Sequence, residues 1–150
     1  MKFKFGLQKV LEHRKTLENI AQRDFQQALQ NLKAEIDLLN HMKKQKHQAF
    51  HQGMNIHIHD RRYIPPRLQQ THEFLIGQDK RIERQKAKVQ EMEIEVEKYR
   101  EILREKVIST KIIDKLKEKK YKAFLAEQNI LEQKELDELN VIRFDREENE

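Results

Sequence analysis

The sequence of 150 residues has few of the residues that interrupt regular structure: three Gly, two Pro and a single Ser, with no Trp and no Cys. Because turn-forming residues are this scarce, the chain can hold only two or three long elements. The lack of Cys leaves no thiol nucleophile and fits a reducing compartment. It decides little more, because a coiled coil can lack Cys in any compartment.

Long apolar runs and catalytic motifs are missing as well. No run of about 18 apolar residues is present, so we expect no membrane-spanning helix. The first residues are interleaved with Lys and Gln and lack the apolar core of a signal peptide, which predicts a cytoplasmic protein. No Gly-rich phosphate loop occurs, and the carboxylates are scattered over polar surfaces. We therefore expect no enzymatic activity, no catalytic residues, no cofactor and no small-molecule substrate.

What the sequence does contain is an uninterrupted seven-residue repeat of apolar side chains. Charged residues make up 38% of the chain, and most positions between the repeats are Lys, Arg, Glu or Gln. This period is typical of a coiled coil, in which a narrow apolar row on each helix faces a partner helix. The predicted fold class is all-α, with two long helices in an antiparallel coiled-coil hairpin. The repeat consists of Leu75, Ile82, Val89, Val96 and Leu103, with Met92 and Tyr99 between them.

The only credible turn is the region that holds both prolines, Pro65 and Pro66. Gly53 at its start can end a helix in a left-handed conformation, and Pro66 suits the first turn of a new helix. The sequence therefore predicts a single hairpin over residues 1–150, with helix 5–52, turn 53–65 and helix 66–144.

The second predicted helix is longer than the first, so part of it lacks a partner within the chain. Folding back about the turn places Leu7 opposite about Ile113. Residues from about Tyr121 onward then extend past the first helix and still carry apolar side chains. An apolar row without an intramolecular partner indicates a docking surface for another protein.

Three stretches of the sequence resemble the flagellar FliJ family, the small coiled-coil component of the bacterial type III export apparatus. Residues 3–11 read Phe-Lys-Phe-Gly-Leu-Gln-Lys-Val-Leu and are followed by Arg14. Residues 125–139 contain Ala-Glu, then Gln-Lys, then Leu-Asp-Glu, which is similar to the C-terminal signature of the family. Residues 73–76, Glu-Phe-Leu-Ile, are similar to the start of its second helix. The resemblance covers essentially the whole chain.

The resemblance implies a two-helix shaft similar to the central γ stalk of rotary ATPases. It implies three partners: the ring of the flagellar export ATPase, the cytoplasmic linker of the membrane export gate, and export chaperones. It also implies a peripheral association with the inner membrane at the export apparatus. The residues expected to bind the ATPase are Leu7, Leu11, Arg14, Phe124, Leu131, Leu136 and Leu139. Those expected to bind the gate are Phe50, Tyr63 and Phe74.

Two other partner classes compete with this interpretation. A generic coiled-coil scaffold, or a stalk of a virulence-type secretion system, would have the same apolar repeat. A nucleic-acid-binding coiled coil would use the basic runs around Lys43 and Lys115, but the net charge of +5 is small and mixed in sign. We therefore expect no nucleic acid as a partner.

The histidines raise the possibility of a metal site. Six of the seven lie between His41 and His72, and His47 and His51 are four residues apart on one helical face. Converging imidazoles could hold zinc or copper. No Cys and no well-placed carboxylate completes such a site, so the sequence favours solvated histidines and no metal.

Overall fold

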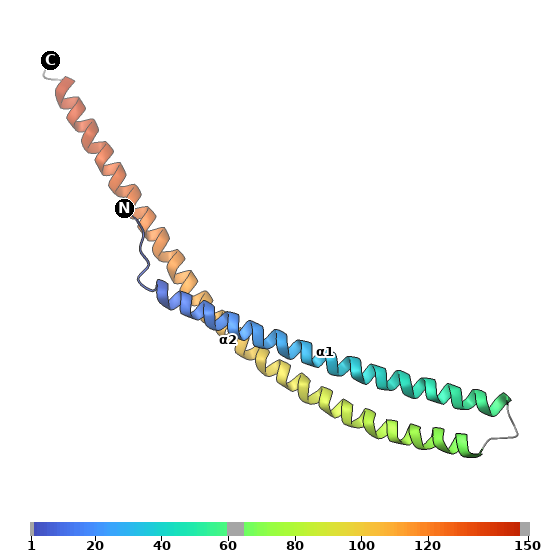
Figure 1. Ribbon diagram of the computed structural model, residues 1–150. Coiled ribbons are helices and arrows are strands. Elements are labelled where there is room, and N and C mark those ends of the chain that lie inside the picture. The colour runs from blue at the N-terminus through green and yellow to red at the C-terminus, as the bar shows by residue number, and fades with distance from the viewer. Residues whose placement is uncertain (1, 60–64, 148–150) are drawn as a thin grey trace. The chain divides into compact units, whose positions relative to one another are not determined.

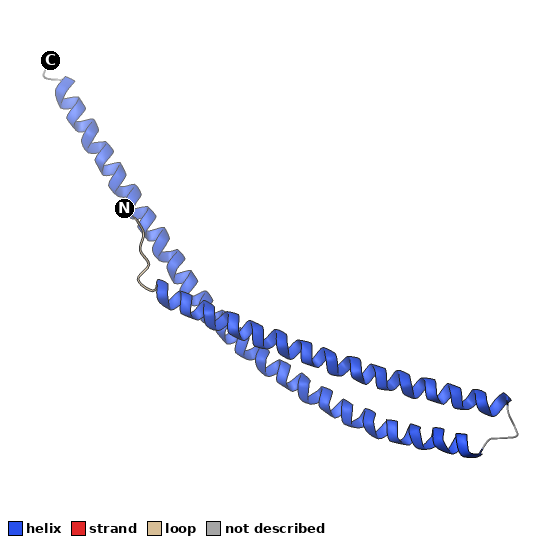
Figure 2. Ribbon diagram, in the orientation of Figure 1, coloured by secondary structure: helices blue, strands red, loops and turns tan. Residues whose placement is uncertain are grey.

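The structure, a computed structural model, describes residues 2–59 and 65–147 and contains two helices, α1 (Gln8–His59) and α2 (Pro65–Glu147). The described residues include no strand (Figure 2). The predicted all-α hairpin with a longer second helix is confirmed. None of the described helices combines the length and apolarity needed to cross a bilayer.

The chain forms two compact units, each with one segment of α1 and one of α2. The middle unit is Ile20–Arg104, and the terminal unit is Met1–Asn19 with Glu105–Glu150. In the middle unit the two segments lie side by side and run in opposite directions (Figure 1). The contacts in the terminal unit, Gln8 with Lys117 and Lys15 with Asp114, show the same antiparallel pairing.

The core of the middle unit is the predicted seven-residue repeat. Ile82, Val89 and Val96 are all at most 8% exposed. On α1, Ala21 and Ala28 are buried too, and they are seven residues apart, which is the period of a coiled coil. Ile82 and Val89 form a cluster with Leu39, against which Leu32, Ile36 and Met42 pack.

Two glutamines interrupt this apolar row and bind the backbone of the facing helix. Gln78 and Gln85 are 2% and 7% exposed. The Nε2 of Gln78 donates to the carbonyl oxygen of Met42 at 3.1 Å, and the Nε2 of Gln85 donates to that of Glu35 at 3.0 Å. Buried polar side chains that are bonded in this way favour one register of a coiled coil over its alternatives.

Glu35 connects the Gln85 contact to a charged partner. Its carboxylate accepts a hydrogen bond from Gln85 and pairs with Lys88 at 2.7 Å. The hydrogen bond from Lys88 is the largest cause that holds the pKa of the Glu35 carboxyl below its ordinary value of 4.5, and the bond from Gln85 acts in the same direction.

The core of the terminal unit consists of Phe5, Leu11 and Ile113, and Phe3, Leu7 and Leu116 pack against it. Leu7 thus packs against the cluster that contains Ile113, and the hydrogen bond between Lys117 and Gln8 places it nearer Lys117 than the hairpin geometry predicts. Helix α1 begins at Gln8 rather than residue 5. The segment before it turns at Gly6, and the carbonyl of Phe5 accepts from the N–H of Gln8 at 3.1 Å.

The prediction that Gly53 ends the first helix is wrong. Helix α1 continues to His59, and no glycine in the described residues has a positive φ. Gly53 instead lies where the helices approach each other closely, since a Cβ at this position would be 2.9 Å from Cγ2 of Thr71. Only residues 60–64 of the predicted turn separate the helices, and they lie outside the described part of the chain.

Candidate partner-binding surfaces

In the terminal unit, the residues before α1 reach further along α2 than the sequence predicts. The ring of Phe3 lies 5.3 Å from that of Tyr121 and 5.5 Å from that of Phe124. The prediction that α2 lacks an intramolecular partner from Tyr121 onward is therefore wrong at these two residues. It missed Phe3 because this aromatic residue precedes the helix and belongs to no repeat.

Polar contacts attach the start of α1 to α2 in the same unit. Arg14 donates from Nη1 to the carbonyl oxygen of Ser109 at 2.8 Å, and Lys117 donates to the side chain of Gln8 at 2.9 Å. The ammonium of Lys120 lies 5.9 Å from the centre of the Phe5 ring. These contacts hold the N-terminal residues against α2 and leave Arg14 engaged within the chain.

The seven residues predicted to bind the ATPase fall into three groups by exposure. Leu11 is only 2% exposed, and its side chain belongs to the core. Leu7, Arg14 and Phe124 are partly buried by intramolecular contacts. The remaining three are exposed and lie on the last part of α2: Leu131, Leu136 and Leu139, at 43%, 60% and 57%.

These three leucines belong to a segment of α2, residues 125–141, that we call the tail segment. Within the terminal unit it continues past the N-terminal residues (Figure 1, orange to red). Every residue from 129 to 141 is exposed. Leu125, Ile130 and Val141 are also large exposed apolar residues in this segment. Such a row of apolar side chains on a charged helix is typical of a protein-binding surface.

The exposed apolar side chains of the tail segment lie on three faces of the helix, one of which is shared by Leu125 and Leu136, eleven residues apart. Leu131 and Leu139 are eight residues apart and share one face, and Phe124 lies seven residues before Leu131 on the same face. Ile130 and Val141 are eleven residues apart and share a different face. We call these the Leu131 face and the Ile130 face.

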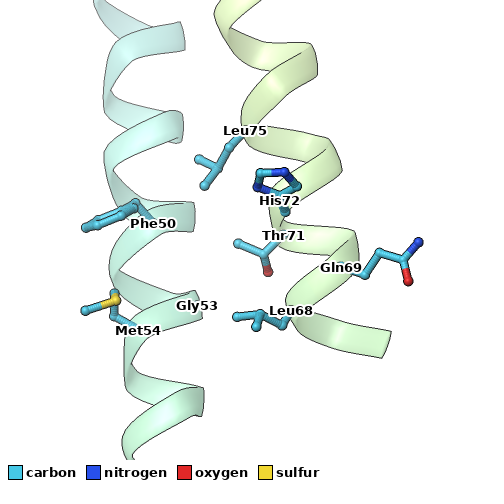
Figure 3. Close-up of a pocket in the computed structure, with 8 residues that line it drawn as sticks. All are labelled: Phe50, Gly53, Met54, Leu68, Gln69, Thr71, His72 and Leu75. Atoms are coloured by element: carbon cyan, nitrogen blue, oxygen red, sulfur yellow. The ribbon is translucent and has the colours of Figure 1, made fainter. Parts of the chain in front are cut away.

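In the middle unit, a second apolar surface lies where α1 ends and α2 begins. It is a groove of about 480 Å³ between the two helices (Figure 3). Phe50 and Met54 on α1 and Leu68 on α2 line it and are 45–50% exposed. The other lining residues are Gly53, Gln69, Thr71, His72 and Leu75.

Two of the residues predicted to bind the gate, Phe50 and Phe74, line two neighbouring grooves. Phe50 lines the groove, whereas Phe74, which is 40% exposed, lines a neighbouring groove with Ala49 and Arg67. Both grooves include Gly53 and Thr71, so the close contact of these two residues separates the two aromatic side chains. Tyr63 lies outside the described residues.

The histidines with described side chains form one close pair. The ring centres of His47 and His51 are 4.2 Å apart and meet edge to face. No group of three or more potential metal ligands occurs among the residues whose side chains are described, 2–55 and 66–141. The side chains of His57 and His59 are outside the description, so the alternative of a metal site that includes them lies outside it as well.

Comparison with known protein families gives a match that covers almost the whole chain. The family described as Flagellar FliJ protein matches residues 3–149. The chain belongs to the FliJ family. No curated protein and no solved structure matches it. FliJ proteins are non-catalytic components of flagellar protein export, and this chain therefore has an export-associated role.

Proposed function

We propose that this FliJ protein binds the ring of the flagellar export ATPase as a central stalk through its terminal unit and contacts the membrane export gate through its middle unit. The terminal unit is the ring-binding end, and the end of the middle unit around Phe50 and Phe74 is the gate-binding end. In this role the protein stays in the cytoplasm and associates peripherally with the inner membrane. It also escorts export chaperones.

The exposed tail segment is the observation that carries the proposal. Leu131 and Leu139 lie beyond Phe124, the last residue of α2 that Phe3 contacts, and both are exposed. A helix that projects from a supported coiled coil can enter a ring and still transmit force or a conformational change to the rest of the chain. The contacts of Phe3 and Arg14 fix the base of this projection.

Co-sedimentation with the assembled export ATPase tests the ring contact. The variant Leu131→Ala/Leu139→Ala removes two exposed leucines from the Leu131 face, and its amount in the ATPase pellet should fall at least about tenfold. The control Ile130→Ala/Val141→Ala removes two side chains that are at least as exposed, at 55% and 61%, from the Ile130 face. Equal loss in both variants, or in neither, would refute a ring contact through the Leu131 face.

The gate contact is tested with a separate variant, because the chain could bind the ring without binding the gate. Phe50→Ala/Phe74→Ala should reduce binding to the cytoplasmic linker of the gate protein. Ile94→Ala removes an exposed residue from the middle of the same unit, at 72% exposure, and should bind normally. A generic scaffold predicts no binding of the linker or the ring by the unaltered chain.

A further inference from the structure

The net charge of the chain changes sign near Phe124, the last residue of α2 that Phe3 contacts. Residues 1–124 contain 28 basic and 17 acidic side chains, whereas residues 125–150 contain three basic and nine acidic ones. The net charges are therefore +11 and −6. The overall value of +5 conceals this division. The tail segment, with five acidic residues and one basic, is an acidic helix on a basic protein.

Three of the five acidic side chains of the tail segment lie on the Leu131 face. Glu135 and Glu138 lie four and seven residues after Leu131, and Glu132 lies seven before Leu139, so they share this face, and all three are exposed. The Ile130 face carries one base, Lys134, and two acids, Glu127 and Asp137, with Lys134 and Asp137 four and seven residues after Ile130 and Glu127 seven before Lys134. The Leu131 face is therefore apolar and carries three carboxylates without a base, whereas the Ile130 face is apolar and has a net charge of only −1.

The Leu131 face also continues the face of α2 that α1 already covers in the terminal unit. Lys117, Phe124 and Leu131 are each seven residues apart. Lys117 bonds to Gln8 and Phe124 contacts Phe3, whereas Leu131 has no such cover. A helix that packs on Leu131 would thus lie in line with α1 and extend the same coiled-coil interface.

From these observations we propose that the tail segment binds a basic amphipathic helix of another protein on its Leu131 face. Apolar side chains of that helix pack on Leu131 and Leu139, and its Lys or Arg residues pair with Glu132, Glu135 and Glu138. The inference rests on the proposed function to the extent that both use the tail segment. It adds the chemistry of the bound element, which the ring contact alone leaves open.

Charge argues against the other occupants of this face. In a dimer that pairs two tail segments through this face, three carboxylates of one copy would face three of the other, which is unfavourable. Nucleic acid and anionic membrane surfaces are repelled for the same reason. A basic helix gains both the apolar contact and the charge pairing.

Binding of synthetic helical peptides to the full chain tests the proposal. One peptide carries Leu at the two apolar heptad positions and Lys at the flanking ones, and the other has Glu in place of Lys. The basic peptide should bind the unaltered protein at least about tenfold more tightly than the acidic one, with an affinity that falls as salt rises. Equal binding of both peptides would overturn the proposal.

Variants of the two faces test whether the peptide binds the Leu131 face. Leu131→Ala/Leu139→Ala and Glu135→Gln/Glu138→Gln should each weaken binding of the basic peptide, whereas Ile130→Ala/Val141→Ala and Asp137→Asn should not. Unchanged binding of the basic peptide by Leu131→Ala/Leu139→Ala and by Glu135→Gln/Glu138→Gln would overturn the proposal. Sedimentation of the full chain provides a second test, because a dimer lost in Leu131→Ala/Leu139→Ala would assign the face to a second copy.

The peptide and ring assays can fail separately. If the basic peptide binds the Leu131 face and the export ATPase does not, the proposed function is wrong and the inference stands. If the ATPase binds and the basic peptide does not, the inference is wrong and the ring contact stands.

Discussion

Two glycines within helices have opposite surroundings, and each therefore has its own reason to be present. A Cβ at Gly77 would meet no atom within 4 Å, whereas a Cβ at Gly53 would lie 2.9 Å from Cγ2 of Thr71. Gly77 therefore only increases the entropy that the chain loses on folding. Gly53 allows α1 and α2 to approach each other.

Adding one methyl group at each glycine tests this difference. Gly77→Ala should raise the free energy of unfolding by about 0.5–1 kcal/mol, because alanine favours the helix. At Gly53→Ala the clash with Thr71 should offset this gain, so its midpoint of thermal unfolding should lie below that of Gly77→Ala. Thr71→Ser removes the clashing Cγ2 and should restore stability in the Gly53→Ala background. Equal stability of the two alanine variants would contradict the close contact.

The lowered pKa of Glu35 makes a contribution to stability that depends on pH. The ionised carboxylate is favoured in the folded state, so its contribution is present above the ordinary pKa of 4.5 and is lost as pH falls through the lower folded value. In Glu35→Gln, thermal unfolding measured from about pH 6 to about pH 3 should show a smaller loss of stability than in the unaltered chain. Glu91→Gln, at an exposed position of α2, is the control. A pH profile that is unchanged in Glu35→Gln would contradict the role of this group.

At the scale of the helices, the polar positions within the apolar row determine how α1 and α2 are aligned. Gln85 is predicted to act through its amide donor, which reaches both the carbonyl and the carboxylate of Glu35. Gln85→Glu replaces that donor by a second carboxylate and should lower the free energy of unfolding by about 1–3 kcal/mol. Gln85→Leu leaves no unpaired donor and should be neutral or stabilising. If Gln85→Leu lowers the free energy of unfolding more than Gln85→Glu does, the contribution of Gln85 comes from its packing and not from its hydrogen bond.

The helices themselves could be predicted because their repeat is long and regular. Ile82, Val89 and Val96 needed only the period of seven to be assigned to the core. Gln78 and Gln85 occupy the same row but could not be recognised, because a polar residue in a repeat is equally compatible with a surface position. Gly53 was misassigned because a glycine that ends a helix and one that lets two helices approach are identical in sequence.

The candidate site was predicted less completely than the fold. The leucines of the tail segment were found because they extend a repeat beyond the predicted first helix. Leu11 and Phe124 were grouped with them, although one is in the core and the other lies under Phe3. That distinction depends on where a short non-helical segment folds, and no periodic pattern encodes it.

At the scale of the whole molecule, the tail segment distinguishes this chain from a simple two-helix hairpin. It is acidic and exposed and carries apolar side chains on more than one face, while the remainder of the chain is basic. Membership of the FliJ family assigns the chain to flagellar export. The proposed stalk role depends on one feature: the N-terminal residues hold α2 as far as Phe124, and the tail segment beyond it is exposed.

ATP hydrolysis by the flagellar export ATPase, measured at a fixed concentration of rings with and without this protein, tests that role most directly. The full chain and Ile130→Ala/Val141→Ala should stimulate hydrolysis, and Leu131→Ala/Leu139→Ala should not. A chain ending at residue 126 keeps Phe124 under Phe3, so it should remain helical by circular dichroism and fail to stimulate. Full stimulation by the shortened chain, or none by the complete one, would contradict the stalk role.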